Sequence, residues 1–387
     1  MIKPDYHGGS LVNLMQSLRA ALGTGGSDAC LPLTGLDLKE LAAARHILLV
    51  VIDGLGENVL RQFPDSSLAR ASRRILTSVF PTTTASAITS LLTGRPPRQH
   101  AVTGWFQWLR EAGVVATILP FVTRAGGVDL RKLGLSVPQV IDTRPFLADV
   151  ERTCRAWLPE AIVNSPYSTT LTAPAVRTGY ASLERLGEGL VQQLRLQPEP
   201  SLTWIYWPEL DSCIHHEGVA SPATAVLFEA LDEWWVGLTR ELAGTDSLVL
   251  LTADHGHIDT AADRHVRLEQ HPELRDCLTL PLCGEPRAAS CYVRPRARQR
   301  FEDYVTTQLA GYCTLLPAAD LVAQGWLGPG ESHPELDSRL GDYVLLMKDN
   351  YVIKDTLGDE RPFSFAGVHS GASREEMEVP LIVQPCG

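Results

Sequence analysis

Short apolar runs alternate with amphipathic stretches along most of the chain. The run His46 to Ile52 is followed by Asp53-Gly54, which is typical of a parallel strand buried on both faces. Similar runs recur at 114–119, 202–207, 247–252 and 379–383. Amphipathic stretches with helical spacing lie between them, at 84–92, 180–194 and 223–242. This alternation predicts an α/β fold with a mostly parallel central sheet and helices on both faces.

Two parts of the chain depart from this alternation. Before the first strand, 10–22 has the pattern of a helix and is followed by a Gly-rich turn and a connector. Near the C-terminal end, a charged helix at 298–309 and a hairpin-like stretch at 343–352 precede the last strand. We therefore predict three parts: an N-terminal helix and connector at 1–40, a core at 41–262 together with 363–387, and an inserted cap at 263–362.

Composition excludes several classes of protein. The 387 residues are 44% hydrophobic and 20% charged, as expected for a folded globular protein. A net charge of −11 argues against binding to a nucleic-acid polymer, which requires a basic surface. The N-terminal MIKPDYHGGS does not resemble a secretion signal, no apolar run is long enough to span a bilayer, and the eight cysteines form no CxxC pair. We expect a cytoplasmic protein without a membrane segment and with reduced cysteines; the sequence does not predict an oligomeric state.

Three of the predicted strands end close to a carboxylate. Asp53 follows 46–52, Asp211 follows the strand at 202–207, and Asp254 follows 247–252. Ligands of open α/β sheets bind beyond the carboxyl ends of the strands. We therefore expect these three acids to meet in one crevice.

Histidines accompany these acids. His215 follows Asp211 by four positions. His255 directly follows Asp254, and His369 lies in GVHSG before the final strand. Three aspartates and three histidines suit two divalent ions with mixed oxygen and nitrogen ligands, with zinc favoured.

A threonine triplet leads into one of the predicted helices. In Phe80-Pro81-Thr82-Thr83-Thr84, the last hydroxyl lies at a helix N-terminus, where free N–H groups favour both its ionisation and phosphate binding. Taken alone, such a triplet is better explained by Thr82 or Thr83 capping the helix. The nearby acids and histidines favour Thr84 as a nucleophile.

Five segments together resemble the alkaline phosphatase superfamily and, within it, the nucleotide pyrophosphatase/phosphodiesterase family. In the family's order, they are VVIDGLG, FPTTTASAITSLLTGRPPRQHAVTG, YWPELDSCIHHEG, LLTADHGH and GVHSGASREEMEVPLIV. The resemblance implies an alkaline phosphatase-like fold and a metal-dependent hydrolase of phosphodiester or phosphoanhydride bonds. It also implies a phosphothreonine intermediate on Thr84 and two divalent ions, zinc or alternatively manganese.

The resemblance also assigns the ligands. One ion would be bound by Asp53, Asp254, His255 and the oxygen of Thr84, and the other by Asp211, His215 and His369. One position departs from the family, because Trp105 stands where its phosphodiesterases have a phosphate-binding asparagine. From position and residue type, we expect Trp105, Phe106 and Arg124, together with the cap, to recognise the substrate.

The substrate expected is a small phosphorylated molecule such as a nucleotide or another phosphodiester. A phosphomonoesterase and a phosphonoacetate hydrolase-like enzyme are the alternatives, because both resemble this pattern. A catalytically silent metal-binding relative is less favoured, since all six ligands and Thr84 are present. His216 and His257 neighbour proposed ligands and are expected to support them, with service as alternate metal ligands as the less favoured interpretation.

Overall fold

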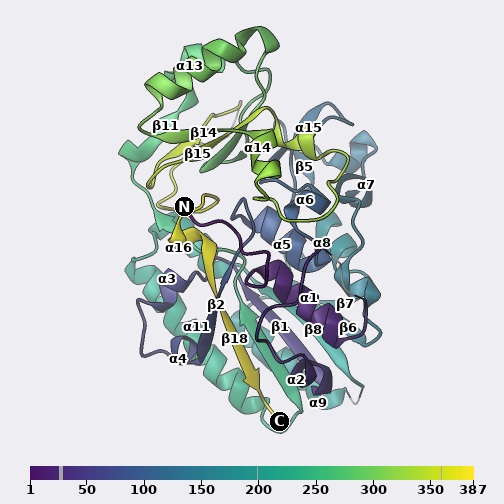
Figure 1. The fold of residues 1–387 in the computed structure, drawn as a ribbon. Helices are drawn as coiled ribbons and strands as arrows, with labels where there is room; N and C mark the ends of the chain where they lie inside the picture. The colour runs from purple at the N-terminus through teal and green to yellow at the C-terminus, as the bar shows by residue number, and fades with distance from the viewer. Residues whose placement is uncertain (26–28, 198, 359) are drawn as a thin grey trace.

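The protein is built on two sheets, shown one above the other in the ribbon of the computed structural model (Figure 1). The structure describes residues 1–25, 29–197, 199–358 and 360–387. Positions 26–28 of the predicted connector, 198 of the predicted core and 359 of the predicted cap lie outside the described residues.

The central sheet has seven strands in the order β2-β18-β9-β1-β8-β6-β7. Their bounds are β1 His46–Ile52, β2 Ser72–Thr77, β6 Thr153–Pro159, β7 Val176–Tyr180, β8 Ser201–Trp207, β9 Ser247–Thr252 and β18 Glu378–Pro385. β1 pairs in parallel with β8 and β9, whereas β18 is antiparallel to β9 and β2. The sheet is therefore mixed but mostly parallel, which confirms the predicted fold class.

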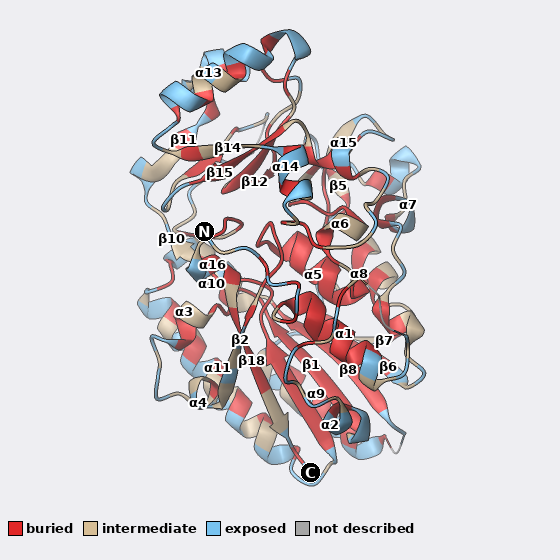
Figure 2. Ribbon diagram, viewed as in Figure 1, coloured by how far each residue is buried: buried red, intermediate tan, exposed pale blue. Residues whose placement is uncertain are grey.

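The burial of the three middle strands explains why their apolar runs predicted strands correctly. Every residue of β1, β8 and β9 is buried. A strand in the middle of a sheet with helices on both faces has no solvent-facing side, so its sequence is continuously apolar. Figure 2 shows β1 and β8 in the colour of buried residues, together with most of α1 and α5, which lie in front of the sheet.

Helices cover both faces of the central sheet. α1 packs against α5 on the face toward the viewer, and α9 packs against α11 behind the sheet (Figure 1). The helices of this part are α1 Leu11–Ala21, α2 Leu38–Ala43, α3 Glu57–Leu60, α4 Ser67–Ala71, α5 Thr84–Thr93, α6 Pro97–His100, α7 Val137–Ile141, α8 Pro166–Leu171, α9 Leu183–Leu196, α10 Glu209–Glu217, α11 Pro222–Glu241 and α16 Arg374–Met377. The helix predicted at 180–194 begins later than expected, because its first residue, Tyr180, ends β7.

The second sheet is antiparallel, in the order β14-β15-β13-β12-β3-β4-β5. Its strands are β3 Phe106–Leu109, β4 Val114–Thr117, β5 Val122–Thr123, β12 Cys283–Glu285, β13 Ala288–Cys291, β14 Cys313–Pro317 and β15 Tyr343–Met347. It thus combines strands from 263–362 with three strands from much earlier in the chain. The expectation that 114–119 joins the central sheet was wrong, because this run forms β4 in a hairpin with β3.

The remaining elements of this upper part are short. They are α12 Pro272–Arg275, α13 Arg298–Gln308, α14 Ala318–Ala323, α15 Leu336–Leu340, β10 Ile258–Asp259, β11 His265–Arg267, β16 Val352–Lys354 and β17 Gly367–Val368. The predicted hairpin at 343–352 was wrong, since β15 pairs with β13 and β14, whereas β16 pairs with β11. No helix among the described residues is long and apolar enough to cross a membrane.

Candidate active site

The carboxyl ends of β1, β8 and β9 face the second sheet (Figure 1). Asp53 directly follows β1, and Asp254 and His255 follow β9 by two and three positions. Because β9 and β1 are paired neighbours, their ends place these three residues together. All three are buried.

Asp211 and His215 reach the same edge from a helix. β8 is followed by Pro208 and then by α10, which carries both residues. Because the two residues are four positions apart on this helix, they lie on the same face of it. His369 follows β17, and its Nδ1 is 3.0 Å from the backbone oxygen of Thr82.

The residues predicted to bind the first ion, called the first ion site below, are Asp53, Thr84, Asp254 and His255. His255 Nε2 lies 3.1 Å from Thr84 Oγ1. It also lies 3.3 Å from Asp53 Oδ1 and 3.5 Å from Asp254 Oδ2. Atoms that bind one zinc ion at about 2.0–2.2 Å are separated by about 3 to 3.5 Å, so this spacing suits a single ion.

The residues predicted to bind the second ion, called the second ion site below, are Asp211, His215 and His369. Asp211 Oδ1 lies 3.4 Å from His215 Nε2 and 3.9 Å from His369 Nε2. A third histidine is closer still, since His257 Nε2 is 2.9 Å from the same oxygen. Asp211, His255, His257 and His369 form one group of side chains that could hold a metal ion, and Asp53, Asp254 and His255 form another; His215 lies near Asp211 but belongs to neither group.

Buried polar atoms at both sites fit the binding of cations. Asp53 Oδ1, Asp211 Oδ1 and Asp254 Oδ2 are buried and have no hydrogen-bond partner. Among the described residues, the basic side chains within 4 Å of these carboxylates are all histidines, and none is a lysine or arginine. Buried carboxylates without a permanently charged partner are costly, and divalent ions would compensate their charge.

The histidines present their Nε2 atoms to these carboxylates. The Nδ1 atoms of His215 and His255 lie 2.8 Å and 3.2 Å from backbone oxygens of Gly367 and Gly256. A histidine ligand commonly donates its other N–H to a carbonyl in this way. Burial lowers the pKa of His215, His255 and, most strongly, His369, so these imidazoles are neutral and offer a lone pair to a metal.

The carboxylates differ in their electrostatic surroundings. Burial raises the pKa of Asp53, and the nearby Asp254 and Asp211 raise it further. Burial also acts to raise the pKa of Asp211, but its histidine neighbours outweigh burial and lower it. Tyr206, which the sequence did not single out, donates its hydroxyl to Asp53 Oδ2. Cations in the site would favour the ionised form of all three acids.

Thr84 occupies the first position of α5, and the threonines before it do not cap this helix. The Thr83 hydroxyl donates to Glu285 Oε1 at 2.5 Å, and the Thr82 hydroxyl donates to the backbone oxygen of Gly371 at 2.8 Å. α5 has no side-chain cap, so no capping side chain accepts from the N–H groups of its first turn, which lie beside Thr84. A phosphoryl oxygen is a suitable acceptor for them.

Glu285 is a buried acid of the second sheet that sequence reasoning missed. Its Oε1 accepts from Thr83 and, at 2.6 Å, from the backbone N–H of Trp105. Burial raises the pKa of Glu285 to about 7. Only the pairing of β12 with β3 brings it to the nucleophile segment, and no local sequence pattern signals such a contact.

The three predicted substrate contacts lie together at the start of β3. The Phe106 ring contacts two cations, since the Arg124 guanidinium carbon lies 4.2 Å and Lys354 Nζ 4.3 Å from the ring centre. The Arg124 side chain is 1% exposed and is paired with Asp355 and Glu360. These contacts favour a structural role for Arg124. Substrate contact by any of the three stays a prediction.

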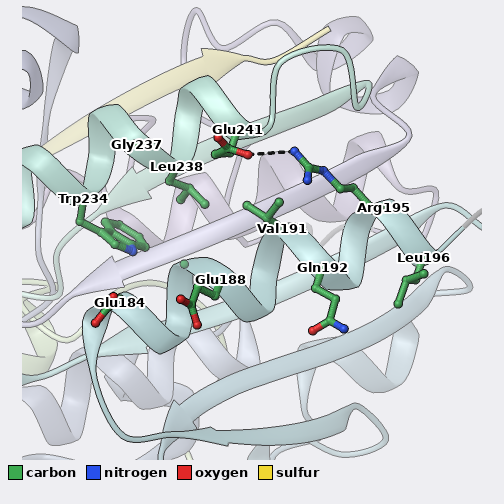
Figure 3. Close-up of a pocket in the computed structure, with 11 residues that line it drawn as sticks. Glu184, Glu188, Val191, Gln192, Arg195, Leu196, Trp234, Gly237, Leu238 and Glu241 are labelled. Carbon is green, nitrogen blue, oxygen red and sulfur yellow. Dashed lines mark hydrogen bonds and ion pairs between the residues drawn. The ribbon is translucent and has the colours of Figure 1, made fainter.

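A surface pocket lies away from these residues, between α9 and α11 (Figure 3). Val191, Trp234 and Leu238 give it an apolar lining, and an ion pair of 2.8 Å joins Arg195 to Glu241 at its side. None of the predicted site residues lines it. The predicted site therefore lies at the strand ends, away from this pocket.

Comparisons with known proteins agree with this arrangement. A family model described as type I phosphodiesterase / nucleotide pyrophosphatase matches residues 47–372. No curated protein matches the chain. Murine ectonucleotide pyrophosphatase/phosphodiesterase 5, solved as an inactive form in complex with AMP, has a similar fold, with a TM-score of 0.67, 16% identity and coverage of 88% of each chain.

Two further solved structures show the same likeness. Another structure of the murine protein has a TM-score of 0.65, and one of human ectonucleotide pyrophosphatase/phosphodiesterase 5 has 0.63; each is 16% identical and covers 87% of both chains. The fold is thus alkaline phosphatase-like, as the resemblance implied. The chain belongs to the type I phosphodiesterase/nucleotide pyrophosphatase family, whose members are metal-dependent hydrolases of phosphoric ester or anhydride bonds.

Proposed function

We propose that this protein hydrolyses phosphodiester or phosphoanhydride bonds of small nucleotide-like molecules, with Thr84 as the nucleophile. The observation that carries the proposal is the place of Thr84 Oγ1. It lies at the N-terminus of α5 and 3.1 Å from His255 Nε2, within the first ion site. A hydroxyl in that position can be ionised by a metal and can reach a phosphoryl group held by the helix N-terminus.

Two zinc ions are the proposed cofactors, with manganese as the alternative. Histidine and carboxylate ligands suit zinc, whereas manganese favours sites richer in oxygen. Asp53, Asp254 and His255 would hold one ion, and the residues of the second ion site the other. When bound, such ions lower the pKa of a coordinated hydroxyl and neutralise charge on the transferring phosphoryl group.

The proposed reaction has two displacements at phosphorus. The Thr84 hydroxyl loses its proton to solvent, and Oγ1 bonds to phosphorus while the bond to the leaving oxygen breaks and this oxygen leaves as phosphate or takes up a proton. The product of this step is a phosphothreonine. A water oxygen then attacks from the vacated side and releases a proton, the bond to Oγ1 breaks and Oγ1 takes up a proton, which restores Thr84. Glu285 keeps Thr83, and hence the start of α5, in place during both steps.

One observation supports a diester or anhydride rather than a monoester, and another supports a nucleotide as the substrate class. A monoester has a third charged phosphoryl oxygen that needs a further cationic partner. Among the described contacts of Thr84 and its metal-ligand neighbours, none is made by lysine or arginine. The AMP bound to the murine relative favours a nucleotide as the substrate class.

Hydrolysis assays test this function. Bis-p-nitrophenyl phosphate, p-nitrophenyl phosphate and phosphonoacetate are compared with zinc and with manganese, for wild type, Thr84→Ala and Thr306→Ala. Thr306 is an exposed threonine on α13 and serves as the matched control. We expect diester hydrolysis to be fastest, to be lost in Thr84→Ala and to be kept in Thr306→Ala. Preference for the monoester or the phosphonate would move the protein to those alternatives, and activity without Thr84 would contradict the mechanism.

A further inference from the structure

We infer that His257 binds an ion directly and completes the second ion site as a fourth protein ligand. The inference rests on the proposed two-metal function and adds a residue that the sequence interpretation had assigned to support. The second ion site would then contain three imidazoles and one carboxylate.

The first argument for this inference is the set of distances around Asp211 Oδ1. His257 Nε2 is the closest of three histidine nitrogens, at 2.9 Å, ahead of His215 at 3.4 Å. Two atoms bound to one zinc at about 2.0–2.2 Å are about 3 Å apart when they subtend a right angle. The position of His257 is therefore that of a ligand sharing an ion with Asp211.

The second argument is the orientation of the His257 ring. His257 Nδ1 faces the backbone oxygen of Gly54 at 3.4 Å, as the Nδ1 atoms of His215 and His369 face the backbone oxygens of Gly367 and Thr82. The ring thus presents Nε2 to Asp211 and Nδ1 to a backbone carbonyl, which is the orientation that histidine ligands of metals commonly have.

The two facing atoms lack other polar partners. Neither His257 Nε2 nor Asp211 Oδ1 has a hydrogen-bond partner, and His257 is fully buried. Buried polar atoms without a partner are costly, and a cation bound by both atoms would remove that cost. An ion in the second ion site would give both atoms the same partner.

The backbone makes room for this ring. Gly54 follows Asp53 with φ of +75°, and a Cβ at this position would come within 2.5 Å of His257 Cε1. The turn after β1 thus lets the imidazole approach the site closely. Three nitrogens and one oxygen form a set that favours zinc over manganese, so His257 would also bias the choice of ion.

The test compares zinc binding by wild type, His257→Gln and His216→Gln. Glutamine can still donate a hydrogen bond to Asp211, so it preserves a merely supporting role but provides no imidazole. His216 is an exposed neighbour of His215 and serves as the control. Zinc per chain and zinc affinity are measured by elemental analysis with a competing chelator, and the imidazole ligands per zinc by X-ray absorption. Circular dichroism checks that each variant is folded.

We expect two zinc ions in wild type and in His216→Gln. In His257→Gln, the affinity of one ion should fall by more than the roughly 10- to 100-fold cost of losing a supporting partner, and each zinc should have fewer imidazole ligands. Unchanged affinity and imidazole count in His257→Gln would overturn the inference while leaving the proposed function intact. Wild type without tightly bound zinc or manganese would overturn the proposed two-metal function as well.

Discussion

A buried ion pair between Arg287 and Glu376 connects the second sheet to the active-site segments. Arg287 lies between β12 and β13, and its Nε and Nη2 donate to the two carboxylate oxygens of Glu376 at 2.6 Å and 3.0 Å. Glu376 Oε1 also accepts from the backbone N–H of Gly371 at 2.7 Å. Gly371 is two residues after His369, and its carbonyl accepts the Thr82 hydroxyl. The pair therefore stabilises both the nucleophile segment and a metal ligand.

Removing one partner should be costly. The two side chains are 2% and 0% exposed, so Glu376→Gln leaves a buried guanidinium without its counter-ion. Breaking such a pair typically costs about 3–5 kcal/mol of unfolding free energy. Arg287→Met should cost a similar amount, because it leaves the carboxylate unpaired. The double variant Arg287→Met, Glu376→Gln should cost clearly less than the sum of the two single variants, since no charge is then left buried.

Urea unfolding followed by circular dichroism measures these costs at fixed pH and zinc concentration. The exposed pair Arg185 and Glu188, with side chains 71% and 56% exposed, is the matched control. Arg185→Met should change the unfolding free energy by less than about 1 kcal/mol. Single variants of the buried pair that cost no more than this control, or a double variant whose cost equals the sum, would refute the reasoning.

Two further predictions concern acids at the site. In metal-free protein, burial raises the pKa of Glu285 to about 7, so the folded state binds its proton more tightly than the unfolded state. This proton binding stabilises the folded state fully below pH 4.5, and the stabilisation is lost as the pH rises to 7. Glu285→Gln should flatten this decline in urea titrations across that range, and an unchanged slope would contradict the assignment. Asp254→Asn keeps the acceptor for the backbone N–H groups of Gly54 and His255 but weakens the first ion site. Elemental analysis should find one zinc fewer, and diester hydrolysis should fall at least about 100-fold because metal stabilisation of the reacting group is worth several kcal/mol; full zinc content would contradict this role.

The elements that the sequence predicted are those whose signal is local. β1, β8 and β9 are apolar at nearly every position because both faces are covered, and the acids directly beyond them follow from strand geometry. Helices α1, α5, α11 and α13 were expected close to their observed bounds, since each has an amphipathic or charged pattern.

The second sheet could not be predicted in the same way. Its strands are short and come from distant parts of the chain, so β4 was assigned to the wrong sheet and β15 to the wrong partner. Glu285 depends on that sheet, because only strand pairing brings it to Thr83. His257 was visible as the second histidine of DHGH, but only the distance to Asp211 distinguishes a ligand from a supporting residue.

The central claim is that Thr84 is the nucleophile of a two-step displacement. The most direct test is the stereochemical outcome at phosphorus, measured with a chiral phosphorothioate diester hydrolysed in isotopically labelled water by the zinc-loaded enzyme. Each in-line displacement inverts phosphorus, so the account predicts net retention of configuration. Net inversion would show a single direct attack by water and would contradict the phosphothreonine intermediate.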